Sequence, residues 1–355
     1  MATFSGTLRS NEIYASIFNL IISQQVFADN IAGTVSSLVE KAKVDGTLYG
    51  DTKLYYATDA LQSTEWGNDA EATNLLALHR PKAPEVQAIM ISNFRQISLT
   101  TDNYLSKRAF ADEGTFSAFN SVMQGWINDT KKIYDSTTYN SFIGTAKSTI
   151  GKQTQTITLS GITATGEEKN RLRAQTIANA LANILVQMTD VSRDYNDYGF
   201  LRSYSYDAIK VVWNSKYMNE ITHMDLPTIF HKDGAKVKDF NDYLPERYFG
   251  TVNTGATKGD GKTIRSMIEQ DIGENHYFAG DLIKSTDTAP ANTSYTEDAK
   301  VICKILVKFP PYMSAFEVGT SFFNPKSLTE NHYLTFGRSD LEYLKNYPMV
   351  TISEA

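Results

Sequence analysis

Two stretches of the sequence repeat hydrophobic residues at the spacing of an α-helix. In residues 115–143 these residues fall on one helical stripe, and the charged residues fall largely off it. The stripe consists of Phe116, Phe119, Met123, Trp126, Ile127, Ile133 and Tyr134, and the charged positions are Asp129, Lys131, Lys132 and Asp135. A second apolar face consists of Leu181, Ile184, Leu185, Met188 and Val191. The pattern predicts two long helices, over about 112–147 and about 167–191.

The first 40 residues are hydrophobic on one side only. Asn11 is a suitable cap for a helix over residues 12–28, and a short amphipathic piece follows at 31–39. Both pieces are too short to bury their hydrophobic side by themselves. We therefore expect them to need a neighbour, in this chain or in another.

Alternating hydrophobic residues predict several strands. The clearest covers residues 300–309 and is ended by Pro310 and Pro311. One of its faces consists of Val301, Cys303, Ile305, Val307 and Phe309. The other face carries Lys300, Lys304 and Lys308, so we expect one buried and one partly wet face. Shorter strands are expected at 156–159, 208–213, 316–318 and 350–352.

Residues 46–105 have a different character from the helices around them. A short strand at 54–56 is followed by a turn-rich middle, and Pro84 then precedes a long extended stretch from Val86 to Thr101. We interpret this region as an extended hairpin of two long strands, whose hydrophobic residues are too sparse for a core of their own. Residues 250–262 read as a flexible loop by composition. The predicted class is α+β, with long elements that protrude from a compact body.

Composition and charge narrow the possible functions. The chain has 355 residues, enough for two or three domains or one elaborated domain, and its 41% hydrophobic content argues against general disorder. The formal net charge is -6, and the longest basic cluster is the interrupted run Lys169, Arg171 and Arg173. Tight direct binding of nucleic acid is therefore not expected. The 20 Tyr and 18 Phe residues fit either a β-rich core or extensive protein–protein contact.

The sequence also bears on the compartment. The N-terminus lacks the basic and apolar regions of a secretion signal, and the apolar patch 17–22 is too short to span a bilayer. Cys303 is the only cysteine, which excludes an intrachain disulfide. We expect synthesis in the cytosol and no membrane partner.

No residue pattern defines a catalytic, cofactor or metal site. The five histidines (His79, His223, His231, His276 and His332) lack zinc-protease spacing and are read as ordinary surface or core residues. The string Glu-Asn-His-Tyr occurs at 274–277 and 330–333, but four residues repeated once do not establish a metal site. Cys303 lies on a hydrophobic strand face and is expected to be an inert buried thiol. We predict that the protein is not an enzyme.

One loop comes close to a phosphate-binding motif. Residues 256–263 read Ala-Thr-Lys-Gly-Asp-Gly-Lys-Thr, but Ala256 occupies the place of the required glycine, and Gly255 comes one position too early. A surface loop is the favoured interpretation. A nucleotide-binding or tail accessory protein that uses residues 255–263 remains the alternative, and it requires stabilisation by nucleotide that Lys262→Ala abolishes.

The order of these parts resembles the major capsid protein of tailed bacteriophages, the HK97-fold family. Residues 1–45, 46–105 and 112–147 look like the N-terminal arm, the extended loop (E-loop) and the spine helix of that family. Residues 208–221 and 225–234 are similar to the entry into its A domain. The resemblance implies a P domain at 106–205, an A domain at 206–298, and a return to the P domain at 299–355.

The resemblance also implies a function. Pentamers and hexamers of the chain would form an icosahedral shell around a double-stranded DNA phage genome, without sequence-specific binding. The expected partners are further copies of the chain, the portal, and scaffolding or cement proteins. The protein would be assembled in the host cytoplasm and would reside in the virion.

Overall fold

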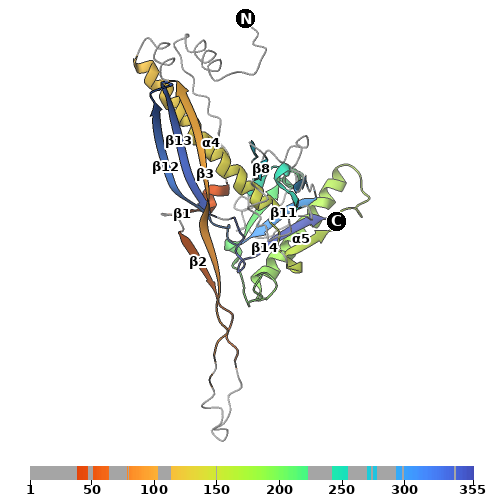
Figure 1. The fold of residues 1–355 in the computed structure, drawn as a ribbon. Coiled ribbons are helices and arrows are strands. Elements are labelled where there is room, and N and C mark those ends of the chain that lie inside the picture. Colours follow the sequence, from red (N-terminus) through yellow and green to blue (C-terminus); the bar gives the residue numbers. More distant parts are fainter. Residues whose placement is uncertain are drawn as a thin grey trace.

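The computed structural model describes residues 38–46, 51–63, 78, 80–102, 113–148, 150–222, 242–254, 270–272, 275–277, 293–297, 300–339 and 341–355. Two five-stranded sheets form its framework, one in a compact body and one that projects from it (Figure 1). The fold is therefore mixed α/β. The predicted helix over residues 12–28 lies outside the described residues.

The described elements follow the chain in a mixed order. The helices are α2 (Leu38–Ala42), α4 (Glu113–Thr145), α5 (Glu167–Thr189) and α6 (Ser215–Thr222), with 3-10 turns at Gly151–Gln153, Tyr206–Ala208 and Glu246–Tyr248. The strands are β1 (Lys43–Asp45), β2 (Thr52–Ala57), β3 (Glu85–Asp102), β4 (Thr154–Ile157), β5 (Lys210–Asn214), β6 (Asp242–Leu244), β7 (Gly250–Thr254), β8 (Gln270–Ile272), β9 (Asn275–Tyr277), β10 (Thr293–Glu297), β11 (Val301–Leu306), β12 (Tyr312–Asn324), β13 (Thr329–Ser339) and β14 (Met349–Glu354). Within this described part, no helix is both long and hydrophobic enough to span a membrane.

The compact sheet has the strand order β4-β14-β11-β5-β6 and is covered on both faces. On one face, hydrophobic residues of α5 such as Leu181 and Met188 pack against Val211 and Ile305. On the other face, Phe142 near the end of α4 belongs to a second cluster. All six residues of β11 are buried as a result. The prediction of one partly wet face is wrong for β11, because α4 covers that face and Lys304 is buried, but Lys300 and Lys308 beyond its two ends are exposed as expected.

The projecting sheet has the strand order β1-β12-β13-β3-β2. Part of α4 packs on one face of this sheet, where Ile127 and Tyr134 meet Leu334 and Phe336 of β13. Figure 1 shows α4 running along the projecting sheet and ending in the compact body. One 33-residue helix thus connects the two sheets rigidly.

Both predicted long helices are confirmed, with corrections to their faces. Met123, Ile127 and Tyr134 of α4 are buried as expected, but Trp126 is 45% exposed. Val191 lies beyond the end of α5 and is 56% exposed, so it does not extend the hydrophobic face of that helix.

The predicted division of α4 into a buried and an exposed side is wrong for two charged residues. Lys131 and Asp135 were predicted to lie off the buried stripe, yet both are buried. They pair with each other at 3.3 Å between Nζ and Oδ2, which satisfies charges that hydrophobic periodicity alone assigns to solvent.

Most predicted strands are present, with different lengths. The strands expected near 156–159, 208–213 and 350–352 correspond to β4, β5 and β14. The expected short strand at 316–318 is part of the 13-residue β12, and its partner β13 was not predicted. Residues 250–254, assigned to a loop, form β7, which pairs with β10.

Candidate assembly surfaces

The predicted hairpin is present at the free end of the projecting sheet. Residues 52–57 of β2 pair antiparallel with residues 85–90 of β3. The expectation of two long strands is only half correct, because β2 has six residues and β3 has 18. The remainder of β3 pairs with β13 instead, so one strand belongs to both the hairpin and the sheet.

The inner face of the hairpin packs against the body. Ala57 and Ile89 are buried there. Gln87 is also buried, and its side chain exchanges two hydrogen bonds with the backbone, donating to the carbonyl of Tyr343 and accepting from the N–H of Lys345, both at 3.0 Å. These bonds satisfy the buried amide and fix the root of the hairpin.

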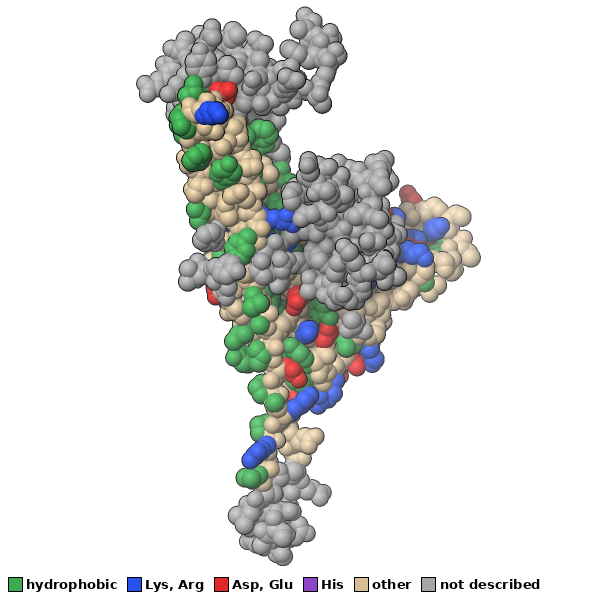
Figure 2. Space-filling model, in the orientation of Figure 1, with side chains coloured by type: hydrophobic (Ala, Val, Ile, Leu, Met, Phe, Trp, Pro, Cys, Tyr) green, Lys and Arg blue, Asp and Glu red, His purple; other side chains and the backbone are tan. Residues whose placement is uncertain are grey.

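The outward face of the hairpin is hydrophobic. The strand register places Leu54, Tyr56, Val86, Ala88 and Met90 together on this face. Four of them remain between 47% and 65% exposed. Figure 2 shows hydrophobic side chains along the projecting sheet and down the hairpin. A solvent face of a sheet is normally polar, so this hydrophobic face is a candidate contact surface.

At the end of the projecting sheet away from the hairpin, one strand edge is unpaired among the described strands. β1 pairs with β12 at 312–314, and among the described strands none pairs with the outer edge of β12 beyond that point. Phe322 and Phe323 near the end of β12 are 61% and 46% exposed. Leu328, in the turn to β13, has a φ of 54° and is 44% exposed. An open strand edge with exposed aromatic residues is a second candidate contact surface.

An ionic cluster, in which Lys131, Asp135 and Tyr312 are buried and Glu317 is exposed, holds α4 against β12. Besides Asp135, Lys131 contacts Glu317, with 3.5 Å between Nζ and Oε2. The hydroxyl of Tyr312 donates to Asp135 Oδ1 at 2.5 Å. Because buried charges need specific partners, this cluster fixes the position of the helix along the strand.

Arg338 makes a similar connection from β13, although its side chain is fully buried. Its Nε donates to the hydroxyl of Tyr134 on α4 at 2.9 Å, and its NH1 donates to the carbonyl of Ser339 at 3.1 Å. The hydroxyl of Ser339 accepts from the N–H of Met313 on β12 at 3.0 Å. The helix and the two strands are therefore locked together by polar contacts as well as by packing.

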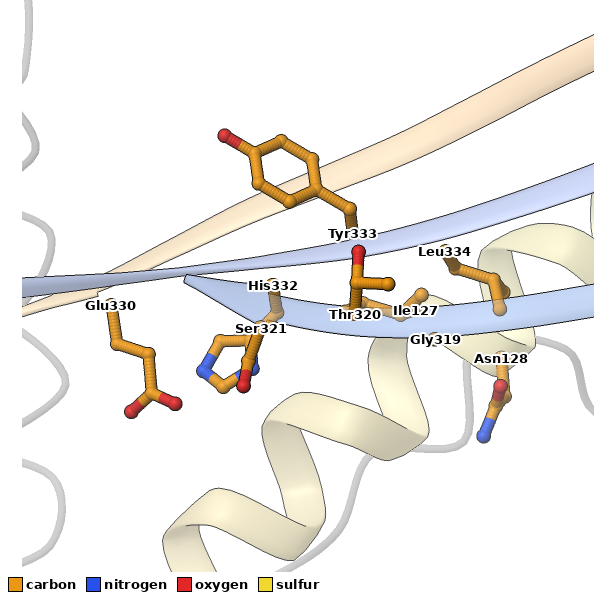
Figure 3. A pocket seen from close by; sticks show the side chains of 9 residues that line it. All are labelled: Ile127, Asn128, Gly319, Thr320, Ser321, Glu330, His332, Tyr333 and Leu334. Carbon is orange, nitrogen blue, oxygen red and sulfur yellow. The ribbon is translucent and has the colours of Figure 1, made fainter. Parts of the chain in front are cut away.

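A cavity of about 410 Å³ lies between α4 and the ends of β12 and β13. Its walls consist of Ile127, Asn128, Gly319, Thr320, Ser321, Glu330, His332, Tyr333 and Leu334. In Figure 3, Glu330 and His332 point to the side of the sheet where α4 lies, whereas Tyr333 points away. His332 Nε2 lies 3.2 Å from the hydroxyl of Thr101 on β3.

The structure bears on few of the chemical sites considered from the sequence. Within the described part, no three His, Cys, Asp or Glu side chains converge on a possible metal site. Burial raises the pKa of the Cys303 thiol, which confirms the expected buried thiol. His79, His223, His231 and the loop 255–263 lie outside the described residues, so the nucleotide-binding alternative stays a prediction.

Besides Lys131, two further buried cations were missed by sequence reasoning. Lys304 is fully buried on β11, and its Nζ donates to the carbonyl of Ala146, just beyond the end of α4. Arg338 is equally buried. A lysine between hydrophobic neighbours on a strand looks the same in sequence whether solvent or a helix end covers it. The one available signal was the nearby proline pair, which shows only where the strand ends.

Solved structures from phage particles share this fold. One is the capsid structure of Staphylococcus phage Andhra, with a TM-score of 0.65 and 11% identity over 93% of this chain and 87% of that chain. Another is the structure of head fiber and inner core protein gp22 of native bacteriophage P68, with a TM-score of 0.63 and 10% identity over the same shares. No protein-family model and no curated protein matches the sequence. The chain thus has the fold of a phage capsid structure, and the resemblance seen in the sequence is confirmed at the level of the fold.

Proposed function

We propose that this chain is the major capsid protein of a tailed phage and assembles into the icosahedral shell that encloses a double-stranded DNA genome. The observation that carries the proposal is the outward face of the hairpin, which is hydrophobic and exposed on an element that projects from the body. The shared fold with the Andhra capsid structure supports it.

The proposal assigns HK97-type roles to the parts of the chain. Residues 1–45 are the N-terminal arm, residues 46–105 form the E-loop, and α4 is the spine helix. Residues 106–205 and 299–355 make the P domain, and residues 206–298 make the A domain. The pairing of β5, in the A domain, with β11, in the P domain, supports a firm connection between these two domains, because it joins them in one sheet.

Assembly in this proposal depends on burying the hairpin's outward face against a neighbouring copy. Leu54, Tyr56 and Met90 are about half exposed, so covering each contributes on the order of 1 kcal/mol. One such contact is weak, but each subunit of a pentamer or hexamer makes and receives it, and the contacts reinforce one another. No catalytic residue or cofactor is needed for this role.

The proposed partners follow from the same role. The chain binds further copies of itself, together with portal and scaffolding or cement proteins, and it assembles in the host cytoplasm before it resides in the virion. A net charge of -6 suits a shell that surrounds DNA without sequence-specific binding.

The proposal is tested by the double variant Leu54→Ser with Tyr56→Ser. We expect a folded subunit that no longer forms shells, because both side chains are exposed in the subunit and buried only on assembly. Val186→Ser with Val191→Ser is the matched control, since these side chains are also exposed but lie near the end of α5. Negative-stain electron microscopy with light scattering measures assembly, and shells from the hairpin variant at the wild-type yield would contradict the proposal.

A further inference from the structure

A loop of the body, residues 190–202, lies beside the hairpin. Ser192 and Arg202 exchange two backbone hydrogen bonds of 2.9 Å across its base. Inside the loop, the buried amide of Asn196 donates to the carbonyl of Phe200 at 2.6 Å and accepts from its N–H at 2.8 Å. Gly199 takes the left-handed φ of 64° that the turn requires. The loop is therefore shaped by its own bonds and offers a fixed surface to the hairpin.

The outgoing side of the hairpin is held by this loop just beyond β2. Asp59 Oδ2 accepts from Arg193 NH1 at 2.8 Å, and Asp59 Oδ1 accepts from the backbone N–H of Leu201 at 3.0 Å. The guanidinium of Arg202 donates to the carbonyl of Thr58. The carboxylate is thus held by a guanidinium and by the backbone of the same loop.

The returning side of the hairpin meets the same loop. Lys82 Nζ lies 4.8 Å from the ring centroid of the buried Phe200, within the range of a cation–π contact. These contacts come after the last paired residues of the hairpin, Ala57 and Glu85, so the β-ladder cannot fix the chain there. Residues 60–63 and 80–84, which follow and precede the paired part of the hairpin, are exposed.

We propose that Asp59 and Arg193 are positioning residues: with the 190–202 loop they set the point and direction in which the hairpin leaves the body. This inference rests on the proposed function, in which the hairpin reaches a neighbouring copy. In the proposed function the residues after Asp59 reach a neighbouring copy, so a change of angle at Asp59 would move them relative to that copy. The contact between Asp59 and Arg193 therefore affects the direction of the hairpin more than the stability of the subunit.

The charge state of Asp59 agrees with this role. The hydrogen bond from the Leu201 N–H, together with that from Arg193, lowers the pKa of Asp59 to about 2. The carboxylate is accordingly charged at neutral pH. Arg193 also donates to the carbonyl of Gly199 at 2.8 Å, which holds the guanidinium in place beside Asp59.

The direction of the hairpin can be measured apart from assembly. Nitroxide labels at Leu61→Cys on the hairpin and Val186→Cys on α5 occupy positions that are 79% and 67% exposed. Cys303 is fully buried and stays unlabelled. Electron–electron double resonance on labelled protein diluted with unlabelled protein then reports the distance within one chain. With Asp59 intact we expect a single narrow distance distribution.

The expected result for Asp59→Ala is loss of the narrow distribution, and Asp59→Asn, which keeps an acceptor for the Leu201 N–H, restores part of it. Asp194→Asn is the control, since Asp194 lies in the same loop but pairs with Lys152 at 2.9 Å. Arg193→Ala gives an independent test if Asp59→Ala does not fold. Equally narrow distributions in Asp59→Ala and the wild type would overturn the inference.

The same variants separate this inference from the proposed function. A broad distribution together with fewer closed shells in Asp59→Ala supports the positioning role. A broad distribution with shells at the wild-type yield would overturn the claim that hairpin direction matters for assembly. If the wild type forms no shells at all, the proposed function fails, while the distance measurement still decides whether Asp59 positions the hairpin.

Discussion

The two five-stranded sheets use hydrophobic residues in opposite ways. In the compact sheet, β11 has all six residues buried, because α4 and α5 of the same chain cover its two faces. In the projecting sheet, the hairpin formed by β2 and β3 buries one face and leaves Leu54, Tyr56, Val86 and Met90 exposed on the other. The first sheet is complete in one subunit. In the second, α4 covers part of one face, but the outward face of the hairpin stays uncovered within the described part of the chain, and this is the face that the proposed assembly would bury.

The largest effect is expected from removing the free part of the hairpin. Replacing residues 60–81 with Asn-Gly leaves Asp59 and Lys82 in place and joins them through a short flexible loop. We expect complete loss of closed shells at an unchanged melting temperature, because no residue of the compact sheet is affected. Electron microscopy and thermal unfolding measure the two outcomes. Normal shells from this variant would show that assembly does not depend on residues 60–81.

A matched pair of core and hairpin substitutions sharpens the contrast. Ile305→Ala should reduce the free energy of unfolding by about 2–5 kcal/mol, because it leaves a cavity where a side chain of 0% exposure was packed. Leu54→Ala should change it by no more than about 0.5 kcal/mol and should instead weaken assembly. Urea unfolding of the dissociated subunit gives both values. Similar losses in the two variants would refute the distinction between the sheets.

The ionic cluster between α4 and β12 gives an intermediate effect. Asp135→Asn leaves the buried Lys131 without its nearest full charge partner, and we expect a loss of about 2–4 kcal/mol. Asp129→Asn is the control on the same helix, since Asp129 pairs at 3.7 Å with Lys132, whose side chain is 72% exposed. That pair should contribute about 0–1 kcal/mol. Equal losses in both variants would mean that the buried pair has no special role.

The smallest effect concerns pH and Asp59. Its pKa is lowered from 3.8 to about 2 in the folded chain, so its stabilising contribution is fully present above about pH 4. That contribution is lost as pH falls from about 4 to about 2, because protonation then releases the hydrogen bonds to Leu201 and Arg193. The difference in unfolding free energy between the wild type and Asp59→Asn should shrink across this window. A difference that stays constant from pH 5 to about 2 would contradict the assignment.

Hydrophobic periodicity predicted the long helices well, because α4 and α5 each present a continuous stripe to a core. It also located the hairpin, since the alternation around Ile89 follows a clear turn signal. It misjudged Lys304 and Lys131. Lys304 bonds to the carbonyl of Ala146, which is distant in sequence, whereas Lys131 pairs with Asp135 one turn along α4 and with Glu317 of β12. Residue type alone assigns such cations to solvent.

The candidate contact surface was harder to predict than the fold. The sequence showed that the hairpin has too few hydrophobic residues for a core, but not which of them face outward. That follows only from the register of β2 on β3, which sets Tyr56 opposite Val86 on the exposed side. The contact of Asp59 with the 190–202 loop joins segments more than 130 residues apart, and no local pattern marks it.

The most direct test of the central claim is the particle mass of the purified wild-type protein, measured by light scattering with electron microscopy of the same sample. The account predicts shells, tubes or capsomer rings whose mass is many times the 39.6 kDa of one chain. A single species of 39.6 kDa at every protein and salt concentration would contradict it. In that case the exposed face of the hairpin would need a partner other than a second copy of this chain.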